Sequence, residues 1–235
     1  TDAIINPLLS EDEFDKEKQN QMALLNIFEE ADKKKKSIVF FDNKVLKNQV
    51  TPESLCFKYY ELIIAVADRF DVNVFFRSKS SDVFHERFYD DYDRAKYFEN
   101  SMKEKGIIYA TSDEHNVMSV ISLADIVVYN RVGTPHMIAL LLDIPGFCFY
   151  DKVLETPDPI IKNYINELAY DDSEKLLDRI GKTLNGEKAP QLTMEHKKLL
   201  NHYMDSKSLE RFKSVMTNII LRKKFLKEQM PEINS

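Results

Sequence analysis

Cysteine and glycine are both scarce in this 235-residue chain, which contains two cysteines and five glycines. Cys56 and Cys148 each lie in an apolar segment, which is typical of buried, reduced thiols and favours an intracellular protein over a secreted one. Five glycines leave little room for glycine-rich phosphate loops. The sequence contains no Walker motif, no dinucleotide-binding glycine signature and no Gly-x-Ser-x-Gly elbow.

Long apolar runs and an excess of basic residues are also absent. No apolar run reaches the roughly 18–20 residues that a membrane-spanning helix needs, so we expect no transmembrane segment. A net charge of -6 argues against nonspecific nucleic-acid binding, so nucleic acid is not an expected partner. No two histidines have the spacing of metal ligands, and we expect neither a metal nor a cofactor.

The residues that are present predict a parallel sheet. Short apolar runs rich in Val, Ile, Phe and Tyr are typical of buried strands, and they occupy residues 37–41, 72–76, 107–110, 125–129 and 146–150. Helical patterns separate them at residues 51–70, 82–105, 116–123 and 134–142. Strands that alternate with helices favour an α/β fold, a Rossmann-like parallel sheet of about five strands flanked by helices.

The pattern changes after residue 152, where Pro157 and Pro159 interrupt the chain. Only helices are predicted beyond them, at about residues 160–168, 173–184, 193–205 and 208–227. Asp171 and Asp172 are candidate caps, and Gly186 is a stop signal. We therefore divide the chain into a linker and lead-in helix (1–36), a Rossmann-like nucleotide-binding domain (37–152) and an all-helical C-terminal extension packed on the same domain (153–235).

Two charged runs are given structural interpretations. The lysines at residues 33–36 are read as a solvated turn that leads into the first strand. The acidic run at residues 89–93 is read as the exposed face of a helix, because consecutive residues on a helix point apart and cannot converge on a metal ion.

Polar residues follow the predicted strands, and the carboxyl ends of parallel strands meet at one rim of the sheet. Thr134 can cap the helix that follows, Pro135 suits its first position, and Gly133 permits close approach of a ligand. A helix start of this kind binds anions, and His136 in its first turn is expected to be a neutral donor. The predicted phosphate- or diphosphate-binding residues are Arg77, Ser78, Lys79, Asn130, Gly133, Thr134 and His136. A weaker nucleotide-binding set is Asp42, Asn43, Thr111, Ser112 and His115. The alternative is that these side chains only satisfy loops and caps, and the sequence identifies no catalytic residue.

Residues 122–151, SLADIVVYNRVGTPHMIALLLDIPGFCFYD, carry a family resemblance. The order of Ala124-Asp125, Gly133-Thr134, Ile144-Pro145 and Phe149-Tyr150-Asp151 resembles the closing part of the nucleotide-binding domain of GT-B glycosyltransferases of the capsule, lipopolysaccharide and teichoic-acid type. The related UDP-N-acetylglucosamine 2-epimerase fold is also similar. The chain departs from the pattern at Ile138, where many members carry a glutamate used on the donor's ribose, and at Asp143, which replaces a common glycine.

The resemblance implies a donor-binding half of a metal-independent glycosyltransferase in surface polysaccharide or glycan biosynthesis. The implied ligand is a UDP-, CDP- or GDP-linked sugar, and the implied partner is a missing N-terminal acceptor domain or partner subunit. The expected location is the cytoplasm, including peripheral association with the inner face of the membrane.

Two other classes of protein stay open. Nucleoside-processing hydrolases and deoxyribosyltransferases also place an Ala-Asp strand before a Gly-Thr helix start. They need a carboxylate nucleophile just inside that helix, where this chain has His136, Met137 and Ile138. A noncatalytic interaction module is the third interpretation, with structural rim residues and a helical C-terminus that docks a partner.

Overall fold

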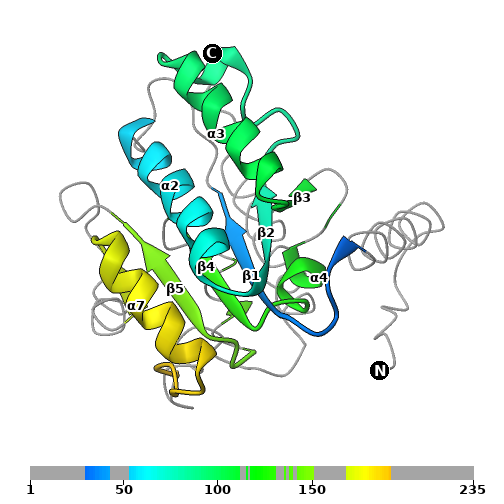
Figure 1. Ribbon diagram of the computed structural model, residues 1–235, viewed down its shortest axis with the longest axis vertical. Helices are drawn as coiled ribbons and strands as arrows, with labels where there is room; N and C mark the ends of the chain where they lie inside the picture. Colours follow the sequence, from blue (N-terminus) through cyan, green and yellow to red (C-terminus); the bar gives the residue numbers. More distant parts are fainter. Residues whose placement is uncertain are drawn as a thin grey trace, which may run out of the picture. The chain divides into compact units, whose positions relative to one another are not determined.

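A six-stranded, all-parallel sheet with the order β3-β2-β1-β4-β5-β6 forms the centre of the structure, a computed structural model (Figure 1). The structure describes residues 30–42, 53–111, 115, 117–130, 135, 138–139, 142–150 and 168–191. The chain divides into two compact units, Thr1–Gln191 and Leu192–Ser235, and the described residues lie in the first. The strands are β1 (Lys36–Phe41), β2 (Val72–Ser78), β3 (Ile108–Thr111), β4 (Ile126–Tyr129), β5 (Gly146–Phe149) and β6 (Ala169–Tyr170). The predicted Rossmann-like α/β class is confirmed.

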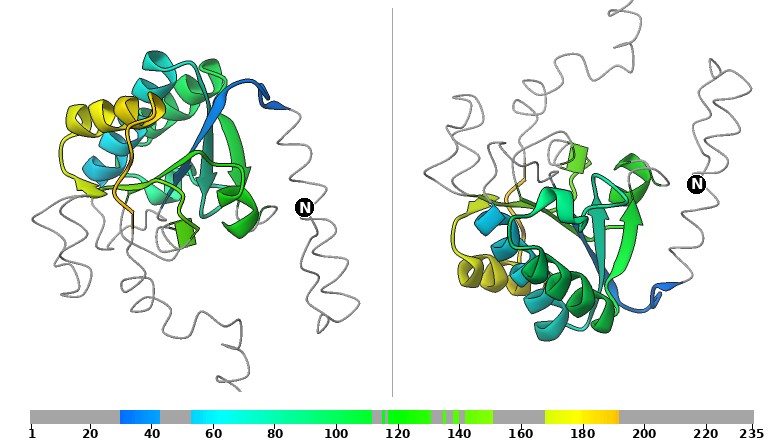
Figure 2. Two further views of the ribbon diagram at one scale, coloured as in Figure 1. Left: turned by 90° about the horizontal axis from the view of Figure 1, so that it is seen from below. Right: turned by 90° about the horizontal axis from the view of Figure 1, so that it is seen from above.

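Helices cover both faces of the sheet (Figure 2). Helices α2 (Glu53–Arg69), α3 (Tyr92–Glu104) and α7 (Ser173–Leu184) lie on one face, which we call the α2 face. The short helix α4 (Val117–Ile121) lies on the opposite face, the α4 face. Side chains along β1 alternate between the two faces of the sheet. Phe40 contacts Tyr59 of α2 edge-on on the α2 face. On the α4 face, Val39 and Phe41 pack in a cluster that includes Val120 and Ile121 of α4.

The ends of α3 and α7 follow from local chemistry. Asp91 and Asp172 are the N-caps, and the Asp172 side chain accepts from the backbone N–H groups of Glu174 and Lys175. The predicted cap and helix at residues 173–184 are therefore confirmed. Each helix ends before a glycine with positive φ, Gly106 at 66° and Gly186 at 92°. Backbone bonds from the Gly106 N–H to the Lys103 carbonyl and from the Ile107 N–H to the Met102 carbonyl complete a Schellman arrangement, which a glycine in the left-handed conformation favours.

Two secondary-structure predictions are wrong. Residues 82–105 do not form one helix, because a 3-10 turn, η1 (Glu86–Phe88), precedes α3, which begins only at Tyr92. The run at 89–93 is therefore not one exposed helix face: Tyr89 is buried and its hydroxyl pairs with that of Tyr60 at 3.0 Å. The second error is in the C-terminal extension, which was predicted to be all helical. Residues 169–170 form β6, which pairs with β5 and extends the sheet beyond residue 152.

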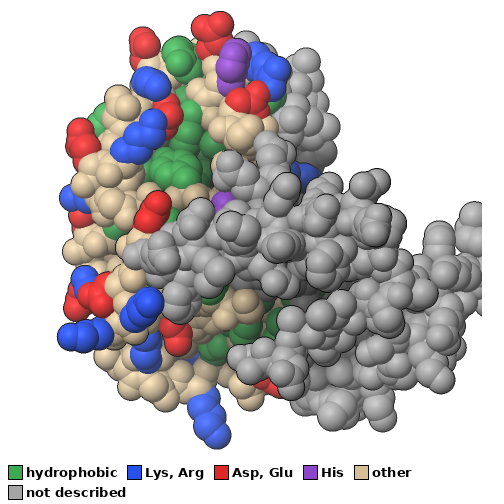
Figure 3. Space-filling view, turned by 90° about the vertical axis from the view of Figure 1, so that its right-hand side faces the viewer, with side chains coloured by type: hydrophobic (Ala, Val, Ile, Leu, Met, Phe, Trp, Pro, Cys, Tyr) green, Lys and Arg blue, Asp and Glu red, His purple; other side chains and the backbone are tan. Residues whose placement is uncertain are grey.

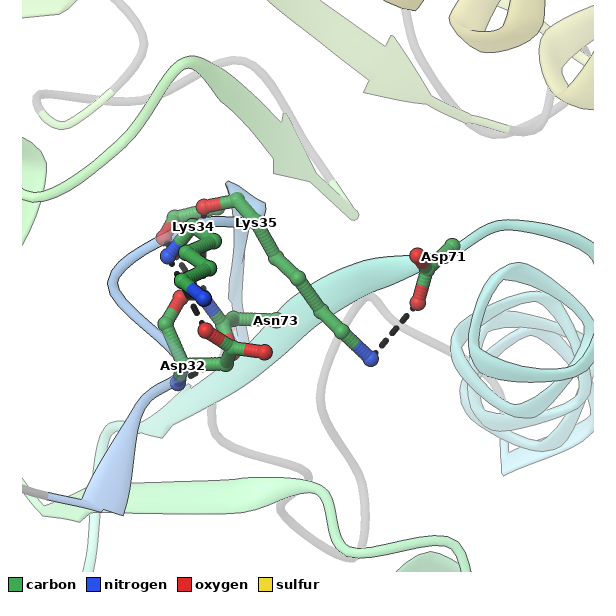
Figure 4. Close-up of polar contacts among 6 residues, drawn as sticks. Asp32, Lys34, Lys35, Asp71 and Asn73 are labelled. Carbon is green, nitrogen blue, oxygen red and sulfur yellow. Dashed lines mark hydrogen bonds and ion pairs between the residues drawn. The ribbon is translucent and has the colours of Figure 1, made fainter.

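The lysine-rich segment at residues 33–36 is an exposed turn into β1, as predicted (Figure 4). Asn73 of β2 holds this turn, since its Nδ2 donates to the Asp32 carbonyl at 2.8 Å and its Oδ1 accepts from the Asp32 N–H at 3.0 Å. Lys35 pairs with Asp71 at 2.6 Å, and Lys34 donates its N–H to the Asp32 carboxylate. These contacts fix the start of β1 at the amino end of the sheet, away from the rim where the predicted site residues lie.

Most of the predicted linker and lead-in helix (1–36) and of the predicted helix at 160–168, and all of those at 193–205 and 208–227, fall outside the described residues. The same is true of most of the predicted helix at 134–142. No helix of the described residues is long and apolar enough to cross a membrane.

Candidate functional site

The candidate site lies at the carboxyl end of the sheet, where β1 and β4 are neighbours. After β1 the chain enters α2 on one face, whereas the Ile138–Ala139 region after β4 packs on the α4 face. This divergence makes the β1–β4 boundary the topological switch point, where open α/β sheets form a ligand crevice.

Asp42 and Asn130 meet at this boundary. Register places Phe41 of β1 beside Tyr129 of β4, so the next residue of each chain segment extends past the sheet at the same level. Asn130 Nδ2 donates to Asp42 Oδ1 at 3.1 Å, and the Asp42 N–H donates to the Arg77 carbonyl at 3.1 Å. Both side chains are buried, with 6% of Asp42 and 1% of Asn130 exposed.

The Asp42 carboxylate raises the pKa values of three side chains of α2. Burial raises the pKa values of the Tyr59 and Tyr60 hydroxyls and of the Cys56 thiol, and the negative charge of Asp42 raises them further. These groups therefore stay neutral at physiological pH. Cys56 is a protonated core thiol rather than a nucleophile.

Arg77 points to the other face of the sheet. It lies opposite Phe41 in the β1–β2 register, and its guanidinium lies over the Phe41 ring at 5.8 Å from the centroid. Arg77 Nη2 donates to the His115 carbonyl at 3.1 Å, and the His115 N–H donates to the Thr111 carbonyl. Arg77 and His115 are thus brought together, and the buried arginine holds the segment that follows β3.

Ser78 and Thr111 face away from Arg77. Consecutive residues of a strand alternate between faces, so Ser78 and its β3 neighbour Thr111 point to the α2 face. Ser78 Oγ donates to the Ser80 carbonyl at 2.6 Å, and Lys79 is exposed at the end of β2. The structure therefore separates the predicted residues into a group at Asp42 and Asn130, a group at Arg77 and His115, and a third at Ser78 and Thr111.

Five of the predicted site residues fall outside the described residues: Asn43, Ser112, Gly133, Thr134 and His136. Their role in anion binding stays a prediction. One contact reaches Pro135, which lies between Thr134 and His136 in the sequence. The Tyr129 hydroxyl donates to the Pro135 carbonyl at 2.7 Å, and the Tyr129 ring is stacked on Phe41 with 5.5 Å between centroids. Sequence reasoning treated Tyr129 only as a strand residue; its place at a strand end six residues before the proline was the available signal.

Burial sets these rim residues apart from the rest of the described chain. The buried polar or charged side chains there are Asp42, Arg77, Ser78, His115 and Asn130, all of which follow or end strands. Charged groups are rarely buried without a structural or functional reason, because desolvation is costly. Their concentration at the switch-point rim identifies it as the candidate site. Among the described residues, no group of three or more His, Cys, Asp or Glu side chains is arranged to hold a metal ion.

Comparison with known proteins gives little to add to this geometry. No protein-family model matches the chain, and no curated protein matches it. Among solved structures, it is similar to the C-terminal domain of a glycosyl transferase group 1 family protein, LpcC, from Francisella tularensis. The two share 17% sequence identity with a TM-score of 0.45, over 78% of this chain and 92% of that chain.

Proposed function

We propose that this chain binds the nucleotide diphosphate of a sugar donor at the carboxyl end of its sheet. In this role it is the donor-binding half of a GT-B glycosyltransferase that acts in surface polysaccharide or glycan biosynthesis. The observation that carries the proposal is the burial of Asp42, Asn130 and Arg77 at the carboxyl end of the sheet, around the topological switch point. The sequence resemblance over residues 122–151 supports the same function.

The rim supplies suitable chemistry for the nucleotide diphosphate of such a ligand. Lys79 provides an exposed cation for the diphosphate, and Arg77 provides a second positive charge beneath the rim. Gly133, Thr134 and His136 would add backbone and side-chain donors at a helix start. The Asp42 carboxylate is an acceptor for ribose hydroxyls or base N–H groups.

The proposal assigns donor binding to this chain and acceptor binding to a separate N-terminal domain or partner subunit. A half-site of this kind binds the nucleotide weakly and does not transfer sugar alone. We expect a Kd of about 0.1–1 mM, which corresponds to a binding free energy of about -4 to -5.5 kcal/mol.

An NMR titration with UDP, CDP, GDP and their sugar conjugates tests the proposal. Lys79→Gln removes an exposed cation and is expected to weaken binding of the preferred nucleotide about three- to tenfold. Lys34→Gln is the matched control, since it removes an exposed cation at the opposite end of the sheet. Arg77→Gln gives a second measurement, interpreted only after thermal unfolding confirms that the variant folds.

No response to any of these nucleotides at millimolar concentration would refute donor binding and favour a noncatalytic interaction module. Equal weakening by Lys79→Gln and Lys34→Gln would show that the response is nonspecific attraction of an anion to surface lysines.

A further inference from the structure

A pocket of about 410 Å³ opens between α3, the segment that leads into it and the edge strand β3. This volume lies within the range of small-molecule sites. The pocket reaches Ser78 and Thr111 on the α2 face, so it begins at the third group of rim residues. β2 separates β3 from β1, and neighbouring strands lie about 4.8 Å apart, so the β3 wall of the pocket lies about 10 Å from β1.

The inner wall of the pocket is aromatic and rigid. Tyr109 of β3 packs edge-on against Phe76 at 5.6 Å and against Phe84 at 6.5 Å between ring centroids. The Tyr109 hydroxyl donates to the Met102 sulfur at 3.4 Å, which fixes the ring. Tyr92, 37% exposed, adds a third ring to the lining. Figure 3 views this side of the molecule and shows apolar surface recessed between charged side chains in the upper part of the face.

Three charged side chains of α3 line the opposite wall. Glu99 Oε2 lies 2.6 Å from the Lys96 ammonium and Glu99 Oε1 lies 2.7 Å from the Lys103 ammonium. Burial alone would raise the pKa of Glu99, but the hydrogen bonds from Lys103 and Lys96 outweigh it and hold this pKa below its ordinary value. Glu99 therefore stays ionised and binds one ammonium group with each of its carboxylate oxygens, so these three side chains carry one net positive charge. Asp82 also lines the pocket, and its carboxylate pairs with Arg87.

The pocket also has donors to offer to a ligand. Each ammonium has three N–H donors, and Glu99 accepts from one on each lysine. Thr111 Oγ1 is buried at the rim end of the pocket and has no hydrogen-bond partner among the described residues. The pocket thus combines flat apolar walls, a pair of cations and a buried hydroxyl.

We propose that this pocket binds a small aromatic monoanion. Its ring lies against Tyr109 and Phe84, and its carboxylate accepts from ammonium N–H groups of Lys96 and Lys103 that Glu99 does not use, where one negative charge neutralises the excess positive charge of the three α3 side chains. The pocket shares Ser78 and Thr111 with the residues predicted to bind nucleotide, but its aromatic wall and its lysines are not among them, so the proposal does not depend on nucleotide binding.

Phenylacetate and its neutral isostere phenylacetamide are the probes that test this site. In an NMR titration of the full chain, we expect phenylacetate to bind with millimolar affinity, at least fivefold more tightly than phenylacetamide. Lys103→Gln is expected to weaken phenylacetate binding at least fivefold. Lys105→Gln is the matched control, because Lys105 follows the same helix but pairs with Asp68 at 2.5 Å and does not line the pocket.

Three results would overturn the proposal. Equal affinity for phenylacetate and phenylacetamide would remove the role of charge. Equal weakening by Lys103→Gln and Lys105→Gln would remove the role of this pocket. Displacement of phenylacetate by the nucleotide that responds to Lys79→Gln would mean that the two ligands share one site. Nucleotide binding that persists in Lys103→Gln keeps a failure here distinct from a failure of the proposed function.

Discussion

At the scale of single residues, Asp143 has an unfavourable backbone conformation, and substitution can measure its cost. Asp143 has a φ of 60°, a left-handed conformation that favours glycine. It lies between α-helical residue 139 and β5, at the position where the sequence resemblance leads one to expect a glycine. The strained residue and the departure from the family pattern are therefore the same position.

Comparison of Asp143→Gly with Asp143→Ala measures this strain. Both substitutions remove the same side-chain interactions, but only glycine adopts a φ of 60° without steric cost. We expect Asp143→Gly to be more stable than Asp143→Ala by about 1 kcal/mol in urea unfolding. Equal stability of the two variants would mean that the turn relaxes to negative φ.

The lowered pKa of Glu99 makes the free energy of unfolding depend on pH. Its pKa is lowered in the folded protein from the ordinary value of 4.5, so ionised Glu99 stabilises the fold above that pH. This contribution is lost as pH falls from about 4.5 through the lower folded value. Glu99→Gln should therefore be less stable than the parent chain at pH 7, with a difference that shrinks as the solution is acidified below pH 4.5. The measurement is urea unfolding of both proteins across this pH range, and a difference that stays constant would contradict it.

The sequence predicted which polar residues lie at the carboxyl end of the sheet, but it did not predict which of them contact one another. Polar residues after strands identified Asp42, Arg77, Ser78, His115 and Asn130, which are the buried polar residues of the described chain. The opposite directions of Arg77 and Ser78 follow from strand alternation and could have been read from the sequence. The Asp42–Asn130 bond could not, because it requires β1 to lie beside β4. The sequence analysis also did not identify the ion pairs of Lys96, Glu99 and Lys103. Their spacing of three and four residues places them on one face of α3, so the ion pairs could have been predicted.

At the scale of elements, the ends of α7 were predictable because their chemistry is local. α7 begins after its N-cap Asp172 and ends before Gly186, as the sequence indicated. The predicted start of α3 was wrong because residues 82–91 have the composition of a polar helix, while Glu53 of α2 accepts from the backbone N–H groups of Asp90 and Asp91. β6 was missed because a two-residue strand has no periodicity to detect; its identity comes from pairing with β5.

The cap of α3 offers a test with little side-chain interference. A Cβ at Gly106 would meet no atom within 4 Å, so Gly106→Ala costs only the energy of the left-handed backbone at φ 66°. We expect a loss of about 1 kcal/mol in thermal or urea unfolding. Glu104→Ala, at the exposed last residue of the same helix, is the control and should change stability by less than about 0.5 kcal/mol. A similar effect of both substitutions would show that the glycine cap is not required.

At the scale of the whole molecule, the two cysteines report on cooperative unfolding. Cys56 and Cys148 are free thiols with 0% exposure, as their apolar sequence context predicted, and they lie on α2 and β5. Because both are fully buried, access to either thiol requires the core to open.

Thiol labelling should therefore be slow in the native protein. We expect both cysteines to react with iodoacetamide at least about a thousandfold more slowly than in the unfolded chain, given a typical stability of 5–15 kcal/mol. Added urea should accelerate both reactions together. Rapid native-state labelling of one cysteine alone, mapped by mass spectrometry, would show that its part of the core opens independently.

The central place of β1 has a consequence for the order of assembly during synthesis. β1 is the first described strand, yet one of its two neighbours, β4, lies far along the chain; the Ser37 N–H donates to Asp125 Oδ2 across 88 residues. A nascent chain that has not yet released residue 126 from the ribosome can pair β1 only with β2. The backbone groups of Ile38–Phe41 that pair with β4 then have no hydrogen-bond partners. Such an exposed apolar strand edge can pair with another chain. Translation pauses or truncations between β3 and β4 are therefore the points at which this protein is most exposed to aggregation.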